Sequence, residues 1–136
     1  MWQDCFDYVT AQTGDIVVSA FQESLEEDSA NRCLWGYCLY IENNSAQKIR
    51  LLKKYFCITD NYGRNYFNVG DGFHGELPDL EPGEYFEFED TIMLDATAAV
   101  LYGSCVAQTA NGDEIKIKLP LVQLAASGKK QVVACH

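Results

Sequence analysis

The sequence has little of the chemistry that most enzymes use. It contains two histidines, His74 and His136, and no Gly-x-Ser-x-Gly motif that would expose a serine nucleophile on a sharp turn. Ser104 follows Gly103 in the middle of a predicted strand. His74 lies in a loop where no acidic or nucleophilic partner converges on it, so we interpret it as a structural turn residue. The sequence predicts a protein that is not an enzyme and has no catalytic residues.

Basic residues are also scarce. Ten lysines and arginines stand against twenty aspartates and glutamates, which gives a net charge of -10. The field of such a chain repels phosphate backbones and anionic lipid headgroups, so we expect no nucleic-acid partner and no membrane partner. Because no localised acidic patch is visible in the sequence, the acidity is interpreted as a feature that keeps the protein in solution.

Long apolar runs and Cys-x-x-Cys pairs are missing. The acidic N-terminal residues resemble no secretory signal, and no later run is long enough to span a bilayer, so a cytoplasmic protein is predicted. The six cysteines, at positions 5, 33, 38, 57, 105 and 135, lack the spacing of zinc ligands. We expect them to be reduced, with Cys57 and Cys105 as small core residues. Neither a metal site nor a cofactor is predicted.

The length and composition are those of one folded domain. The chain has 136 residues, of which 48% are hydrophobic and 12% aromatic. A domain of this size buries enough surface to fold without a metal or a disulfide. The predicted organisation is an N-terminal arm over residues 1–13, a β-domain over 14–126 and a C-terminal tail over 127–136.

Alternation with a period of two is the main signal that is present. From residue 33 to 43, apolar side chains recur at every second position, the period of a strand with one buried face. These side chains are Trp35, Tyr37, Leu39 and Ile41. The polar break at residues 44–46 predicts the turn of an antiparallel hairpin at the centre of a sheet. In the second arm the apolar phase changes, which predicts a β-bulge between Leu52 and Tyr55.

Further alternating segments complete a sheet protein. They cover residues 15–25, 65–69, 85–92, 99–110 and 114–119. Phe86 and Phe88 are expected on the inner face of one strand, and Asn111-Gly112 is a strong hairpin signal. About seven strands and no helix predict an all-β fold, an antiparallel β-sandwich of the immunoglobulin or fibronectin type III kind, with a closed barrel as the second choice.

The order of several short motifs resembles the ApaG family over Gly14 to about Ala126. The motif residues are Ser29, Arg32, Leu34-Trp35-Gly36-Tyr37, Ile41-Glu42-Asn43, Leu51-Leu52, Ile58-Thr59-Asp60, Gly63, Gly70-x-Gly72-x-x-Gly75-Glu76-x-Pro78, Leu80-x-Pro82-Gly83 and Gly103-Ser104. The sequence departs from the family pattern at Leu77, where a glutamine is usual, and at Cys105 and Ala107, where larger residues are common.

The resemblance implies a fibronectin type III-like sandwich with a poorly defined activity. The family is named for a bacterial protein linked genetically to cobalt and magnesium tolerance. In eukaryotes the domain occurs in F-box proteins and in a polymerase-interacting protein, where its presumed role is to bind other proteins. The resemblance therefore implies a protein-binding module.

The glycine-rich loop from Gly70 to Pro78 is the candidate binding site. Its members are Gly70, Gly72, Phe73, His74, Gly75, Glu76 and Pro78. No helical pattern follows the glycines, so the loop lacks the helix N-terminus that gives a dinucleotide motif its affinity for phosphate. Three interpretations stay open at this point: a structural loop, a rigid ledge for a protein partner with Phe73 as an exposed anchor, and an amide nest for an anion.

We therefore expect a binding module that engages a protein partner through this loop. A homodimer through a sheet edge is a further expectation. The alternative function is a sensor of a small anion, such as pyrophosphate or a nucleotide, or of magnesium or cobalt. Metal-dependent hydrolysis of a phosphorylated metabolite is a third and weaker alternative.

Overall fold

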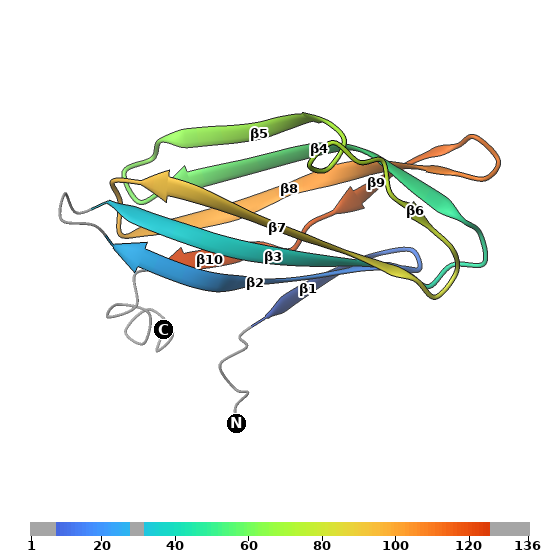
Figure 1. Cartoon of the computed structure of the whole chain (residues 1–136), viewed down its shortest axis with the longest axis horizontal. Coiled ribbons are helices and arrows are strands. Elements are labelled where there is room, and N and C mark those ends of the chain that lie inside the picture. Colours follow the sequence, from blue (N-terminus) through green and yellow to red (C-terminus); the bar gives the residue numbers. More distant parts are fainter. Residues whose placement is uncertain (1–7, 28–31, 126–136) are drawn as a thin grey trace, which may run out of the picture.

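The computed structural model describes residues 8–27 and 32–125, which form ten β-strands and contain no helix that could cross a membrane. The strands are β1 (Val9–Thr13), β2 (Ile16–Glu27), β3 (Cys33–Asn43), β4 (Ile49–Asp60), β5 (Asn65–Asp71), β6 (Asp79–Leu80), β7 (Tyr85–Leu94), β8 (Ala98–Thr109), β9 (Glu114–Lys118) and β10 (Val122–Ala125). They run lengthwise along the molecule (Figure 1).

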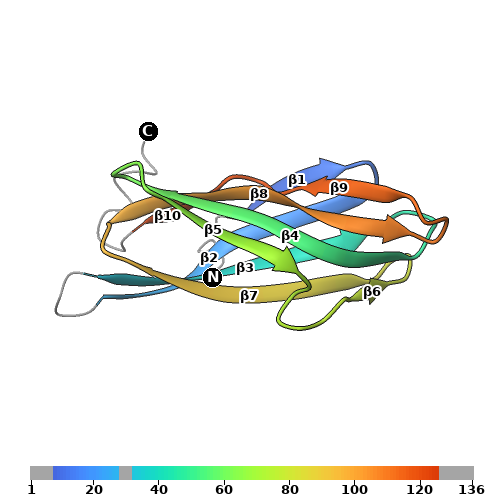
Figure 2. The same cartoon turned by 90° about the horizontal axis from the view of Figure 1, so that it is seen from above.

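The strands form two antiparallel sheets that pack face to face (Figure 2). Sheet A has the order β1-β2-β3-β7. Sheet B has the order β10-β8-β4-β5, with β6 paired to β4 and β9 paired to β8. The predicted antiparallel β-sandwich is therefore confirmed. The structure has three strands more than the sequence predicts, β1, β6 and β10, which are all short.

Alternate side chains of the two sheets fill the space between them. In β3 the four predicted inward residues, Trp35, Tyr37, Leu39 and Ile41, are all buried. The Trp35 indole Nε1 donates a hydrogen bond to the Ala125 carbonyl at 3.2 Å, which satisfies its one polar group. In β4, Phe56 and Ile58 face the same core. Burying side chains of this size supplies most of the free energy that holds the sandwich together.

The predicted hairpin of residues 33–60 is wrong. β3 pairs with β2 and β7 in sheet A, whereas β4 pairs with β5, β6 and β8 in sheet B. The chain crosses from one sheet to the other after Asn43. The alternation of apolar side chains predicts the buried face of each strand correctly, but it indicates only which face is buried. It does not distinguish a turn within one sheet from a crossing between two sheets that share a core.

The Asn43 side chain holds this crossing together and is itself fully buried. Its Nδ2 donates to the carbonyls of Gln47 at 2.8 Å and Leu80 at 2.9 Å. Its Oδ1 accepts hydrogen bonds from the Ser45 amide and hydroxyl. A buried amide with all these partners satisfied links the end of β3 to the start of β4 and to β6.

The predicted bulge in β4 lies at Leu52, at the N-terminal limit of the predicted range. The register of β4 against β8 shifts between Leu51 and Lys53. The extra residue lets Leu51 and Phe56, which are in opposite phases of the alternation, both face the core.

Two smaller expectations need correction. Residues 9–13, expected to belong to a loosely held arm, form β1 and pair with β2. Cys57 is half-exposed on the outer face of sheet B, because its neighbours Phe56 and Ile58 take the inward positions, while Cys105 is buried as predicted. Cys38, Cys57 and Cys105 are free thiols. Residues 1–7 and the predicted tail lie outside the described residues.

Asp60 organises the turn between β4 and β5. Its side chain is fully buried and accepts hydrogen bonds from the amides of Tyr62 and Arg64, from the Arg64 guanidinium at 2.7 Å and from the Tyr66 hydroxyl. Burial alone would raise the pKa of this carboxyl, but the backbone amides and the Arg64 guanidinium outweigh burial and lower it. The Arg64 guanidinium also reaches the exposed carboxylate of Asp95 at 2.7 Å.

The Asp60→Asn variant tests this turn. We expect the melting temperature at pH 7 to fall by several degrees, because the neutral amide loses the charge that pairs with Arg64. A lowered carboxyl pKa contributes stability that is present above the unfolded pKa of about 3.9 and is lost as the pH falls through the folded value. The difference from the unaltered protein should therefore shrink below about pH 4. Asp95→Asn, at the exposed end of the same network, is the control and should change the melting temperature little.

Candidate functional site

The glycine-rich loop connects β5 to β6 and contains a tight turn. Phe73 and Glu76 exchange backbone hydrogen bonds, at 2.8 and 3.1 Å. The two residues between them, His74 and Gly75, have φ values of 52° and 84°, the sign that a type I′ turn requires at both central positions. Gly72 also has positive φ, and a Cβ at this position would lie 3.0 Å from the Glu76 carbonyl oxygen. The glycines therefore give the loop one defined, sharply turned backbone.

Phe73 is not the exposed anchor that the sequence suggested. Only 1% of its surface is accessible, and its ring packs edge to face against Phe56, Phe86 and Phe88 at centroid distances of 5.5 to 6.4 Å. The Lys54 ammonium lies 5.7 Å from the ring centroid. The turned backbone directs this side chain inward, where burial of an aromatic ring is worth more than exposure. Phe73 therefore fastens the loop to the core.

His74 closes the space between the loop and β7. Its Nε2 donates to the Glu89 carbonyl at 2.8 Å, and its ring stacks on Phe88 at 4.6 Å. The hydrogen bond ends on a main-chain carbonyl and not on a carboxylate or a nucleophile. This arrangement agrees with the interpretation of His74 as a structural turn residue.

Three amides of the loop, those of Gly72, Phe73 and Glu76, bond to main-chain carbonyls of the protein. The Gly72 amide donates to the Leu52 carbonyl at 2.8 Å, and those of Phe73 and Glu76 bond within the turn. Lys54 Nζ donates to the Gly72 carbonyl at 2.8 Å, which fixes the base of the loop. An amide nest for an anion needs several N–H groups that point outward together, and these three amides are already bonded within the protein.

The outward side of the loop carries one large exposed apolar side chain and adjoins a shallow groove. Leu77 is 50% exposed and Tyr85, at the start of β7, is 59% exposed. The groove has a volume of about 620 Å³ and is lined by Glu76, Pro78, Asp79, Leu80, Gly83, Glu84, Tyr85 and Phe86. The Arg50 guanidinium holds both carboxylate oxygens of Asp79, at 2.7 and 3.2 Å, and so fixes the wall formed by β6. Of the predicted site residues, Glu76 and Pro78 border this groove, whereas Phe73 lies behind it.

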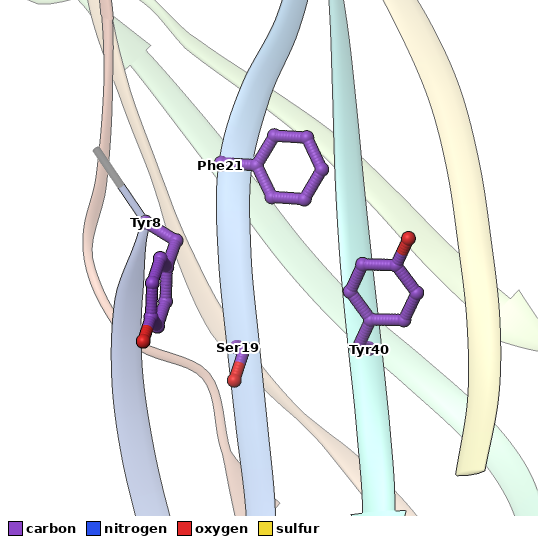
Figure 3. A pocket seen from close by; sticks show the side chains of 4 residues that line it. All are labelled: Tyr8, Ser19, Phe21 and Tyr40. Carbon is purple, nitrogen blue, oxygen red and sulfur yellow. The ribbon is translucent and has the colours of Figure 1, made fainter. Parts of the chain in front are cut away.

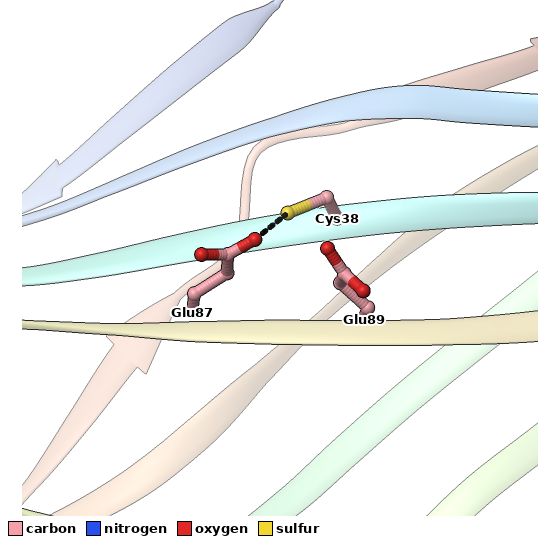
Figure 4. Close-up of side chains that lie close together, drawn as sticks. All are labelled: Cys38, Glu87 and Glu89. Atoms are coloured by element: carbon pink, nitrogen blue, oxygen red, sulfur yellow. Dashed lines mark hydrogen bonds between the residues drawn. The ribbon is translucent and has the colours of Figure 1, made fainter.

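A second group of residues, on the outer face of sheet A, was not anticipated. Cys38 of β3 lies between Glu87 and Glu89 of β7, with the three ligand-type atoms within 4.8 Å of one another (Figure 4). The Cys38 thiol donates a long hydrogen bond to Glu87 at 3.8 Å. Burial, then the charges of Glu87, Glu23 and Glu89, raises the pKa of this thiol to about 12, so it is protonated at neutral pH.

An aromatic hollow lies beside this cluster. It has a volume of about 430 Å³ and is lined by Tyr8, Ser19, Phe21 and Tyr40 (Figure 3). The Phe21 and Tyr40 rings are stacked at 6.1 Å, and Tyr85 lies 5.7 Å beyond Tyr40. The sequence carries no signal for this grouping, because β7, which carries Tyr85, pairs with β3 from far along the chain, whereas β2 and β3 are consecutive strands whose outward side chains show no distinctive pattern.

Truncation of Phe73 tests whether it holds the loop to the core. Phe73→Ala should lower the free energy of unfolding by about 3–5 kcal/mol, the range for a phenylalanine removed from a packed core. Phe67→Ala is the matched control, because Phe67 is 71% exposed and its loss should cost less than about 0.5 kcal/mol. Urea denaturation followed by tryptophan fluorescence measures both. Equal effects of the two substitutions would contradict the assignment of Phe73 to the core.

Comparisons with known proteins agree with this fold. The ApaG domain model matches residues 23–109. Among curated proteins, Protein ApaG of Agrobacterium fabrum is 33% identical over 126 residues, covering 90% of this chain and 97% of that protein. Protein ApaG of Rhizobium leguminosarum bv. trifolii is 34% identical with the same coverage.

Two solved structures share the architecture. The X-ray structure of Northeast Structural Genomics Consortium target SoR45 aligns with a TM-score of 0.81 and 25% identity, covering 87% of this chain and 92% of that one. The putative ApaA protein of Bordetella pertussis aligns with a TM-score of 0.75 and 22% identity, over 88% and 95% of the two chains. Because the domain model spans most of the sandwich and the curated relatives match over nearly their whole length, this chain belongs to the ApaG family.

Proposed function

We propose that this protein is a non-catalytic binding module that engages a protein partner through the outward side of the loop 70–78. One observation carries the proposal: the loop is fixed from behind by Phe73 and presents the half-exposed Leu77 next to Pro78, which lines the same groove as Tyr85. A surface that is already held in one conformation loses little entropy when it binds.

Exposed residues around the groove take the place of Phe73, the anchor that the sequence suggested, because Phe73 is buried. Leu77 and Tyr85 supply the exposed apolar area, with Glu76 and Glu84 at the polar border of the groove. Apolar and aromatic anchors with a polar rim are typical of protein interfaces. We also propose a cytoplasmic location.

We further propose that two copies can pair through a sheet edge. β5 is the last strand of sheet B, and its Phe67 and Val69 are 71% and 55% exposed. An edge strand with exposed apolar side chains is a surface on which a further strand can pair. Sedimentation of the protein over a range of concentrations would detect such a dimer.

Quantitative affinity capture from the native cell tests the loop surface. Leu77→Ser should reduce the recovery of the specific partner by at least tenfold relative to the unaltered protein. Leu121→Ser is the matched control, because Leu121 is 53% exposed, undergoes the same change and lies in the connection between β9 and β10. Recovery that is the same for both variants and the unaltered protein would overturn the proposal.

A second candidate function, binding of a divalent cation, is supported by the grouping of Cys38, Glu87 and Glu89. Two carboxylates and a thiol suit a transition metal such as cobalt better than magnesium, which prefers oxygen ligands. Because the thiol must lose its proton to coordinate, cobalt affinity should rise with pH.

Thermal-shift measurements with cobalt and magnesium test this candidate. A cation that binds the folded state should raise the melting temperature, by several degrees at concentrations well above its Kd. Glu87→Gln with Glu89→Gln should abolish the shift, whereas Asp113→Asn with Glu114→Gln, on the far sheet, should not. An unchanged melting temperature across both cations would exclude the candidate.

A further inference from the structure

The two sheets differ in the sign of their charges. The strands of sheet A contain no lysine or arginine. Their acidic residues are Glu23, Glu26, Glu27, Glu42, Glu87, Glu89 and Asp90. The strands of sheet B, in contrast, carry both signs: Arg50, Lys53, Lys54, Lys116 and Lys118 stand beside Asp60, Asp71, Asp79 and Glu114. The negative charge of the strands is therefore concentrated in sheet A.

On the outer face of sheet A, carboxylates and tyrosine rings stand opposite one another. The register of β3 against β7 pairs Tyr40 with Glu87 and Glu42 with Tyr85. Cys38 faces Glu89 in the next outward pair (Figure 4). Glu42, Glu87, Glu89 and Tyr85 are exposed, and Tyr40 is half-buried between them. Each carboxylate therefore lies beside or diagonally opposite an aromatic face.

In the part of the chain that the structure describes, these carboxylates form no salt bridge. Within residues 8–27 and 32–125, the salt bridges join Arg50 to Asp79 and Arg64 to Asp60 and Asp95, and none involves the outer face of sheet A. The raised pKa values of Cys38 and Tyr40, both about 12, have burial as their first cause and the Glu87 charge among the others. The face thus combines negative potential with exposed π-surfaces.

We propose that this face, made by Tyr40, Glu42, Tyr85, Glu87 and Glu89, binds a lysine- or arginine-rich segment of a partner protein. A cationic side chain gains from both components of the face, through attraction to the carboxylates and through cation–π contact with the tyrosine rings. A neutral apolar segment would leave the carboxylates facing a dehydrated surface, and an acidic segment would be repelled.

The spacing of the face suits an extended segment. Glu87 and Glu89 project from the same side of β7, two residues apart, which corresponds to about 6.8 Å along a strand. An extended basic peptide has the same repeat, so alternate cations can meet successive carboxylates. This surface differs from the loop surface of the proposed function, although Tyr85 borders both.

Fluorescence anisotropy with labelled hexalysine and hexaglutamate peptides tests the inference on the full chain. We expect hexalysine to bind and hexaglutamate not to bind. Glu87→Gln with Glu89→Gln should weaken hexalysine binding by at least tenfold. Asp113→Asn with Glu114→Gln is the matched control, because it removes the same charge from exposed positions at the start of β9, and it should change the Kd less than twofold.

Equal weakening by the two double variants would overturn the inference, because binding would then depend only on net charge. Thermal melting of each variant confirms that it is folded; the glutamines keep the size of the glutamates and remove repulsion between neighbours. Raising the ionic strength should weaken hexalysine binding. The ratio of the Kd of the Asp113→Asn with Glu114→Gln control to the Kd of the unaltered protein should stay the same.

Two further readouts separate this surface from others. Leu77→Ser should leave hexalysine affinity unchanged, and a loss equal to that of the glutamate variants would place the site at the loop instead. Amide chemical shifts in NMR spectra should change along β3 and β7; changes confined to β4 and β9 would contradict the inference. A self-association of the protein alone that is abolished by Glu87→Gln with Glu89→Gln would show that the occupant is a second copy and overturn the proposed partner.

Discussion

The hydrogen bonds of the buried Asn43 amide are the interaction on which the rest of the arrangement depends. Where the chain leaves sheet A for sheet B, the strand ladder ends, and this side chain takes its place by bonding to Ser45, Gln47 and Leu80. The Asn43 main chain also bonds to Gly83 and Glu84 in the turn before β7. One residue therefore fixes the crossing, β6 and the start of β7, and these elements form the frame in which the glycine-rich loop sits.

Periodicity predicted the strands far better than it predicted their partners. Alternation identified the buried faces of β3 and β7, because in a sandwich each of these strands has one side against the core. It did not separate the two faces of β2, both of which carry apolar side chains. It failed for the connection at residues 44–46, since the same polar residues suit a hairpin and a crossing. It also missed β6, whose two residues are too few to show any period.

The candidate sites were less accessible from the sequence. A phenylalanine among glycines is expected at the surface, and only the positive φ angles at Gly72, His74 and Gly75 explain how the backbone turns Phe73 into the core. Because Phe86 and Phe88 are predicted to face inward, Glu87 and Glu89 are expected on the solvent-exposed face of the same strand, where the structure has them. Their neighbours, however, come from β3, about fifty residues earlier in the chain. What a surface offers to a partner depends on pairing between distant strands, which local patterns do not specify.

The separation of charge between the layers has a consequence for the molecule as a whole. The strands of sheet A carry acidic residues and no basic ones, whereas those of sheet B carry both signs, so the charges of the strands make a dipole moment directed across the sandwich, from one flat side to the other. In the electric field of a highly charged partner, this dipole experiences a torque that turns one face of the sandwich toward the partner before the two molecules meet. The molecule is therefore oriented before it makes contact, and because the sandwich is flat, the face that leads is broad.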